Sequence, residues 1–422
     1  MNKRAEQTLD LVVRGGRVID TGRGIDEQLD IGVQFGRIVM MEPDLRAWVR
    51  SPNSEYPPDV GTVVIDASGK IVVPGLIDMH AHVYTGVCPL TVPADETSSR
   101  SGVTTIVSAG DAGAHTIEGF RHLVVNASRT RVLAFVHIST IGLAGWPEGE
   151  AVDLAYLDVG KAVRAAIENA DIVVGIKVRE QGIIVGDNGL EPVRRAVEAG
   201  ERAGLPVMVH IGGAPAPLSE ILDILRPGDI VTHCYTPIGN GLVADNRLIE
   251  AAEPARQKGI IFDSGHGFGS FDYATAEVAF EAGFWPDTIS TDLHSLSASG
   301  PVGDMPTTMS KFLNLGMPLY EVIRATTTRP AEVIGRRETV GSLRIGNVAD
   351  ITVLDLASGD FEFRDSSGAV RIAPQRLVVS DTIRAGIPWG APLPHPGRTP
   401  FAPPPDSLPP RPPREKLGPR GA

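Results

Sequence analysis

The stretch Leu76-Ile-Asp-Met-His80-Ala-His82-Val decides how this chain folds. It is a short apolar run of the kind that forms a buried β-strand, and two histidines lie at its end. Because side chains alternate between the two faces of a strand, His80 and His82 point in the same direction. Two imidazoles on one face, at the end of a buried strand, form half of a metal site. The other half is expected at the ends of later strands.

Further apolar, β-branched runs follow along the chain, and helix-like segments separate most of them. The predicted strands cover residues 76–83, 104–110, 131–139, 172–178, 206–212, 229–235, 260–267 and 288–294, and the predicted helices include 156–170, 191–204 and 272–283. Eight almost continuously apolar strands with helices between them predict an α/β fold, a parallel (β/α)8 barrel of the TIM type. A doubly wound open sheet is the alternative, although no Gly-rich dinucleotide fingerprint follows the first strand.

The two ends of the chain have a different pattern. Short β-branched segments separated by Gly, Asp and Pro precede the barrel and also follow it, so two half-sheets are expected to pack into one small β-sandwich. We therefore predict a sandwich domain from residues 1–73 plus 340–387 and a catalytic barrel from 74–339. The Pro-rich tail, 388–422, cannot form a helix or a central strand, and we expect it to be disordered or to wrap a neighbouring subunit.

Composition excludes several classes of protein. No apolar stretch of the 422 residues approaches the roughly 20 that a membrane helix needs. The formal net charge of −12 disfavours nucleic acid and anionic membranes as partners. The two cysteines, Cys88 and Cys234, do not form a disulfide framework, and we expect a cytoplasmic protein.

Metal-binding and proton-transferring residues recur at the C-terminal ends of the predicted strands. In a (β/α)8 barrel these ends meet at one mouth, where the active site lies. The residues concerned are His80, His82, Lys177, His210, His233 and Asp292. Imidazole and carboxylate ligands suit zinc, manganese, iron or cobalt better than magnesium or calcium. The sequence therefore predicts a metal centre at the mouth.

Lys177 is the unusual member of this set. It lies in an apolar strand, which disfavours the charged ammonium and lowers its pKa. A neutral amine can react with carbon dioxide to give a carbamate, an anionic group able to bridge two metal ions. The alternative is an ion pair between Lys177 and a carboxylate such as Asp292. The histidines around it favour the carbamate.

The substrate is expected to be acidic. Arg179 lies two residues beyond Lys177 on the same strand face, and its guanidinium can bind a carboxylate through two hydrogen bonds. An N-acyl amino acid, an acylated 2-hydroxy acid or a cyclic ureide with a carboxylate fits this expectation. Tyr235, His266 and His294 lie at or just beyond strand ends, and we take them as further substrate-binding candidates.

These motifs resemble those of a known family. Pro74-Gly-Leu-Ile-Asp-Met-His80-Ala-His82, Gly175-Ile-Lys177-Val-Arg179, Thr232-His233-Cys and Ser290-Thr-Asp292-Leu-His294 are similar to signatures of the amidohydrolase superfamily, in its binuclear branch with a carboxylated lysine. Ser108-Ala-Gly-Asp-Ala-Gly and Ser139-Thr-Ile-Gly-Leu resemble the narrower amidohydrolase/deacetylase group, which is dihydroorotase-like. The resemblance covers roughly residues 8 to 385.

The resemblance implies a site and a reaction. His80 and His82 would bind the more buried of two divalent ions, His210 and His233 the more exposed one, and carboxylated Lys177 would bridge them. Asp292 would bind the first ion and carry the proton. The ions would be Zn²⁺, with Mn²⁺ as the second choice, and the reaction would be hydrolysis of an amide bond, with esters also possible. The family also suggests a homo-oligomer.

Other activities remain as alternatives. Deaminases of the superfamily carry a Glu shortly after the histidine that corresponds to His210, and none is present, which disfavours deamination. Tyr84 and the residues after it replace an arginine that true dihydroorotases carry, although a cyclic amidohydrolase of the dihydroorotase or hydantoinase type is the first alternative. A metal-free, non-catalytic scaffold is the second, and it is disfavoured because all six ligand positions are filled.

Overall fold

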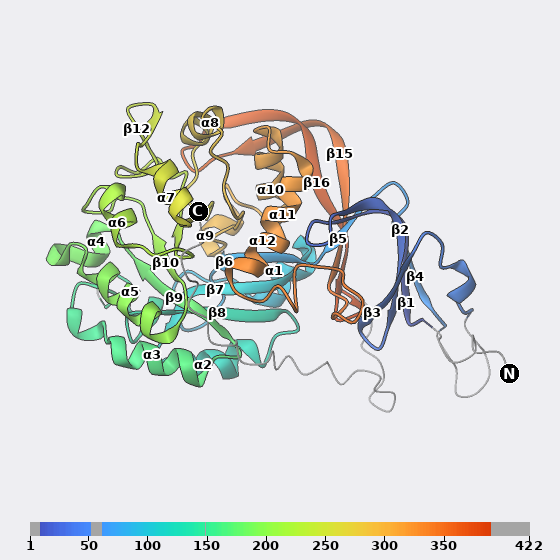
Figure 1. Cartoon of the computed structure of the whole chain (residues 1–422), viewed down its shortest axis with the longest axis horizontal. Coiled ribbons are helices and arrows are strands. Elements are labelled where there is room, and N and C mark those ends of the chain that lie inside the picture. The colour runs from blue at the N-terminus through green and yellow to red at the C-terminus, as the bar shows by residue number, and fades with distance from the viewer. Residues whose placement is uncertain (1–8, 52–60, 148, 390–422) are drawn as a thin grey trace, which may run out of the picture.

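A computed structural model describes residues 9–51, 61–147 and 149–389 of the chain. Figure 1 shows two bodies side by side, a barrel surrounded by helices and a sheet with strands from the first and the last part of the described chain. The predicted Pro-rich tail lies outside the described residues from 390 onward. Among the described helices none is long and apolar enough to cross a membrane.

Seven parallel strands form the barrel wall in the order β14-β11-β10-β9-β8-β7-β6. They are β6 (Leu76–Ala81), β7 (Val103–Gly113), β8 (Arg131–His137), β9 (Val173–Arg179), β10 (Val207–His210), β11 (Ile230–Thr232) and β14 (Ile261–Asp263). Single parallel bridges join Asp263 to Thr288 and Ala81 to Leu293, so the segment between them closes the ring where the eighth strand is expected. Every residue of β6, β7 and β8 is buried, as expected when helices cover a parallel sheet. The predicted barrel is confirmed.

Helices surround this wall, and local sequence sets their ends. Asp158 caps α3 by accepting a hydrogen bond from the N–H of Lys161, and Gly204, with φ at 66°, ends α5. The three predicted helices correspond to α3 (Val159–Glu168), α5 (Glu191–Ala203) and α8 (Tyr273–Glu281). The others are α1 (Ala94–Ser101), α2 (Ile117–Phe120), α4 (Gly182–Val185), α6 (Leu218–Ile224), α7 (Ala252–Lys258), α9 (Ser295–Ala298), α10 (Met305–Asn314), α11 (Leu319–Thr326) and α12 (Thr328–Val333).

The second body is a mostly antiparallel sheet to which both chain ends contribute. Its order is β17-β16-β15-β5-β1-β2-β3, with β4 paired to β1. The strands are β1 (Leu11–Asp20), β2 (Ile25–Gln34), β3 (Arg37–Glu42), β4 (Val63–Asp66), β5 (Ile71–Pro74), β15 (Ile351–Arg364), β16 (Val370–Arg384) and β17 (Ile387–Pro388). The contribution of both ends agrees with the expected sandwich, whereas the exact boundaries at 73/74 and 339/340 stay a prediction.

The hairpin of β15 and β16 links the two bodies. It runs from the sheet and arches over α10 on the barrel side (Figure 1). The N–H of Leu377 in β16 donates to Ser310 Oγ in α10 at 2.9 Å, and the N–H of Tyr273 donates to Asp365 at 2.9 Å, just beyond the end of β15. The hairpin therefore packs against the loops that follow β14, which lie next to the barrel mouth.

Candidate metal centre

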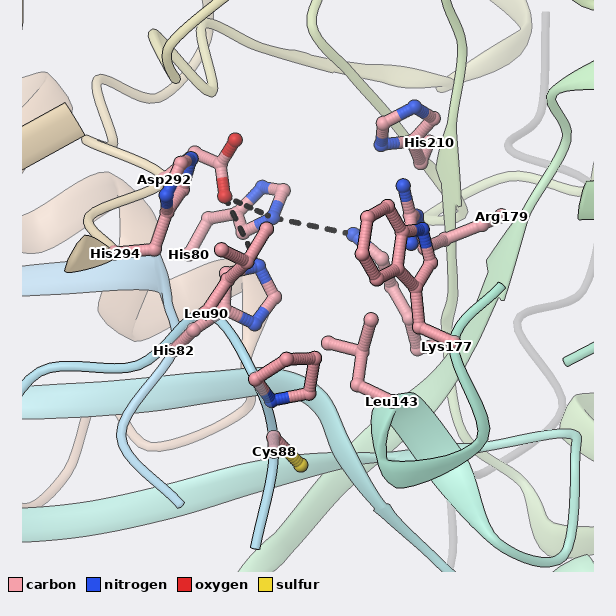
Figure 2. Close-up of a pocket in the computed structure, with 12 residues that line it drawn as sticks. His80, His82, Cys88, Leu90, Leu143, Lys177, Arg179, His210, Asp292 and His294 are labelled. Atoms are coloured by element: carbon pink, nitrogen blue, oxygen red, sulfur yellow. Dashed lines mark hydrogen bonds and ion pairs between the residues drawn. The ribbon is translucent and has the colours of Figure 1, made fainter. Parts of the chain in front are cut away.

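Four predicted ligands meet at one point inside the barrel mouth. Nε2 of His82 lies 3.0 Å from Asp292 Oδ1, and Nε2 of His80 lies 3.3 Å from the same oxygen. The Lys177 Nζ is 3.4 Å from His80 Nε2. Figure 2 shows these side chains pointing toward one another from β6, from β9 and from the closing segment.

The two remaining predicted ligands lie beside this group. Nδ1 of His210, at the end of β10, is 2.7 Å from Nε2 of His233, and the His233 ring centroid is 5.0 Å from that of His80. One ligand atom each from His80, His233 and Asp292 lie within 4.8 Å of one another. The structure thus brings all six predicted ligands together.

The backbone is unusual where it delivers two of these side chains. His233 and Asp292 have φ angles of 71° and 47°, in the left-handed region that side chains other than glycine rarely adopt. A Cβ on Gly265 would lie 2.2 Å from Thr232 Oγ1 and 2.8 Å from His233 Nδ1, so only glycine fits behind the histidine. The strain and the close approach both occur at the site, as is common for functional residues.

A hydrogen-bond chain fixes the tautomer of His80. Thr232 donates its only hydroxyl proton to Asp263 at 2.7 Å, so Thr232 Oγ1 must accept from His80 Nδ1, 2.8 Å away. Nδ1 of His80 therefore carries the proton, and its Nε2 lone pair faces the other ligands.

Similar contacts fix the other two rings. His82 Nδ1 lies 2.6 Å from Oδ1 of buried Asp111, whose other oxygen accepts the N–H groups of Val83 and Tyr84. His233 Nδ1 donates to the carbonyl of Gly265 at 2.6 Å. In both rings Nε2 is left to face the site. Buried imidazole nitrogens whose rings are each oriented by a second contact, beside a carboxylate, are the kind of donor set that binds a divalent transition metal.

Burial and neighbouring charges change the ionisation of these groups. Burial lowers the pKa of Lys177 to about 7 and that of His233 to about 4. Burial also opposes charge on His82, but Asp111 and Asp292 outweigh it and raise the pKa of His82 to about 9. Burial works against ionised Asp292 as well, yet His80 and His82 hold its pKa well below the usual range. Asp292 is therefore a carboxylate beside an amine that is partly neutral at neutral pH.

A pocket opens over this group. His294 and Arg179 are polar residues of its lining and lie on opposite sides in Figure 2, and Cys88, Pro89, Leu90, Leu143 and Trp146 are the other residues that line it beside the candidate ligands. The guanidinium of Arg179 is bound by Glu150, with Nη1 2.8 Å from Oε1. The predicted position of Arg179 at the pocket agrees with the structure, but its carboxylate partner Glu150 was not predicted.

Two predicted substrate-binding residues lie elsewhere. Tyr235 is fully buried, donates its hydroxyl to the Phe284 carbonyl at 3.1 Å and packs against aromatic rings. His266 stacks on Phe271 with ring centroids 4.5 Å apart, and Lys311 Nζ lies 2.7 Å from its Nε2. Neither side chain is among the residues that line the pocket, and the substrate-binding role expected for both stays a prediction. His294 does line it, as predicted.

Comparison with known proteins agrees with this geometry. A model of the amidohydrolase family matches residues 71–386. A deacetylase of Agrobacterium fabrum is 40% identical over 308 residues, which cover 72% of this chain and 75% of that protein. A solved structure named an adenine deaminase has a TM-score of 0.81 at 31% identity and covers 90% of this chain and 99% of its own. Another, named a dihydroorotase, has a TM-score of 0.81 at 32% identity and covers 90% and 97%.

Proposed function

Because the chain belongs to the amidohydrolase family, we propose that it is a metal-dependent deacylase that hydrolyses an amide or ester bond in a small carboxylate-bearing substrate. N-acyl amino acids and acylated 2-hydroxy acids are the substrate classes that we favour. The observation that carries the proposal is the convergence of His80, His82 and Asp292 beside the His210–His233 pair, in a pocket that also contains an arginine.

The site fits two divalent ions. His80 and His82 would hold the more buried ion together with Asp292, and His210 and His233 would hold the second; Zn²⁺ is our first choice and Mn²⁺ the second. When bound, two such ions lower the pKa of a water and polarise the substrate carbonyl.

We propose that Lys177 is carboxylated. It is fully buried and points among the ligands, where an ammonium would repel a metal ion. Its uncharged Nζ attacks the carbon of carbon dioxide, a C–N bond forms, and one N–H proton leaves to solvent. The amine becomes an anionic carbamate whose two oxygens would serve both metal positions.

Residues of the chain itself would transfer the proton, bind the substrate carboxylate and exclude water. Asp292 Oδ1 lies 3.3 Å from His80 Nε2 and 3.0 Å from His82 Nε2, and we assign it the proton that the attacking water loses and the leaving nitrogen or oxygen gains. The Arg179 nitrogens that do not contact Glu150 would bind the substrate carboxylate. Leu143 and Trp146 would cover the apolar part of the substrate and exclude water.

Metal content tests the proposal directly. Protein produced with added zinc or manganese and bicarbonate should hold about two metal ions per chain by mass spectrometry, and Lys177→Ala should hold fewer than two. Incubation with ¹³C-bicarbonate should give a carbamate NMR signal in the wild type that Lys177→Ala lacks. Lys161→Ala, which removes an exposed lysine, is the matched control.

Activity separates the alternatives. Hydrolysis of N-acyl amino acids or acylated 2-hydroxy acids supports the deacylase, whereas ring opening of dihydroorotate or a hydantoin without deacylation would replace it with the cyclic amidohydrolase. A protein that binds two metal ions but shows none of these activities would contradict the proposed substrate class. If the folded protein holds no metal although all six candidate ligands are in place, the remaining alternative is the metal-free, non-catalytic scaffold.

A further inference from the structure

Glu150 lies in the loop that follows β8, and it is completely buried although it carries a carboxylate. Its Oε1 is 2.8 Å from Arg179 Nη1, and its Oε2 is 3.3 Å from His137 Nε2. The N–H of Ser139 donates to His137 Nδ1 at 2.9 Å, which turns Nε2 toward Glu150. Oε1 of Glu150 accepts a hydrogen bond from Arg179, whereas Oε2 has no hydrogen-bond partner among the described residues.

The same loop supplies part of the apolar lining of the pocket. Leu143 and Trp146 line the pocket, and Trp146 is still 37% exposed. Near its base the loop is held by a hydrogen bond from Ser139 Oγ to the Gly149 carbonyl at 2.9 Å and by one from Asn188 Nδ2 to the Ala151 carbonyl at 2.7 Å. Glu150 lies between these two backbone contacts, and it is the loop's link to Arg179.

We propose that Glu150 is a positioning residue that sets substrate selectivity, because it holds the Arg179 guanidinium and, from the same point, the loop that carries Leu143 and Trp146. An arginine side chain has several rotatable bonds, so a buried carboxylate on one of its nitrogens restricts where its other nitrogens lie. Glu150 then couples the position of the charged contact of the pocket to the position of the apolar contacts that the loop supplies. This inference rests on the proposed function, in which Arg179 binds a substrate carboxylate.

The consequence for substrates is specific. A substrate must present its carboxylate and its apolar group at the separation that Glu150 imposes, and either feature alone is not enough. Loss of the Glu150 charge should therefore weaken binding of carboxylate substrates more than it slows the chemical step, because the metal ligands are not touched.

A double-mutant cycle tests the link to Arg179. Glu150→Gln and Arg179→Met are compared singly and together on a carboxylate substrate that the wild type hydrolyses and on its uncharged methyl ester. Glu150→Gln should raise KM for the carboxylate substrate about tenfold, with kcat changed less than about threefold and with little change for the ester. The double variant should be no worse than Arg179→Met alone. Glu150→Asp should recover part of the loss, and Asp153→Asn, an acid-to-amide change on the same loop, is the matched control.

Any one of three outcomes would overturn the inference. Equal loss of kcat on both substrates would give Glu150 a purely structural role, and additive effects in the double variant would mean that it does not act through Arg179. If Arg179→Met fails to distinguish the two substrates, the proposed carboxylate contact fails instead, and the loop is then tested without substrate. Glu150→Gln should change the tryptophan fluorescence, and the change should vanish in a Trp146→Phe background; an unchanged spectrum would remove Glu150 as the tether of the loop.

Discussion

Asp111 Oδ1 lies 2.6 Å from Nδ1 of His82, and the other Asp111 oxygen accepts the backbone N–H groups of Val83 and Tyr84. One buried carboxylate therefore fixes both the ring of His82 and the chain that leaves β6. Contacts of this kind set which imidazole nitrogen is free for a metal ion.

Asp111→Asn tests this contact. The amide still accepts the two backbone N–H groups with its oxygen, which leaves its NH₂ facing His82 and favours the wrong tautomer. We expect metal affinity to fall roughly 10- to 100-fold in competition with a chelator. Asp66→Asn changes an exposed aspartate and should have no effect. Unchanged affinity in Asp111→Asn would show that the Asp111 contact does not orient His82.

Thr232→Val tests the corresponding support of His80. Valine has nearly the same shape but cannot accept from His80 Nδ1 or donate to Asp263. Metal affinity should fall about tenfold, while Thr232→Ser, which keeps the hydroxyl, should stay close to the wild type. If the serine variant loses as much as the valine variant, packing and not the hydrogen bond supports the ring.

Arg179→Met tests the charge preference of the pocket. Methionine keeps much of the length of the side chain but removes the guanidinium. We expect KM to rise about 10- to 100-fold for carboxylate substrates, because a charged hydrogen bond is lost, and to change little for uncharged esters. An equal loss on both kinds of substrate would contradict a carboxylate-binding role.

The convergence of the six candidate ligands could be predicted because their signals are local. Alternation along a single strand places His80 with His82 and Lys177 with Arg179, and successive strand ends of a parallel barrel meet at one mouth. The residues that orient them could not be predicted in this way. Asp111 is on β7, 29 positions from His82, and Asp263 is 31 positions from Thr232, so only the folded barrel brings them together.

The two misplaced residues also have a physical explanation. The prediction extended strand alternation past the end of β11 at Thr232, but His233 has a positive φ, so the alternation stops and Tyr235 enters the aromatic core. Gly265 has φ at 45° just after β14 and likewise redirects His266 onto Phe271. A sequence pattern that assumes regular strand geometry cannot anticipate such turns.

The buried carboxyl group of Glu180 should make the stability of the protein depend on pH in an unusual way. Its side chain is fully buried, neither oxygen has a hydrogen-bond partner among the described residues, and burial raises its pKa to about 8. In the folded protein Glu180 keeps its proton up to about pH 8, whereas in the unfolded chain it loses this proton above about pH 4.3. The free energy of unfolding therefore falls as the pH rises from about 4.3 toward 8.

Glu180→Gln removes that titration. The variant should be more stable than the wild type at pH 8.5, by about 1–3 kcal/mol, and the difference should shrink toward pH 5. Thermal unfolding of both proteins at the two pH values measures it. A constant difference at both pH values would mean that Glu180 ionises normally in the folded protein.

The side chain of Lys311 anchors the loop beside Asp292. Its Nζ, on α10, lies 2.5 Å from the Pro301 carbonyl, 2.6 Å from the Arg364 carbonyl and 2.7 Å from His266 Nε2. Three acceptors match the three protons of an ammonium, although burial lowers the pKa of Lys311 to about 7. The contact ties the β15–β16 hairpin to the loop whose Gly267 N–H donates to the Thr291 carbonyl at 2.9 Å.

Lys311→Met should therefore destabilise the protein and loosen this loop. Methionine fills a similar volume but removes the donor that Lys311 supplies to three acceptors, of which His266 is buried, and we expect a loss of roughly 2–4 kcal/mol in unfolding free energy. Hydrogen exchange should increase at residues 264–272 and around Asp292, since the loop and the segment that carries that aspartate share backbone hydrogen bonds. Lys161→Met removes an exposed lysine and should change neither measurement. Full stability with unchanged exchange in Lys311→Met would show that the hairpin holds the loop without this lysine.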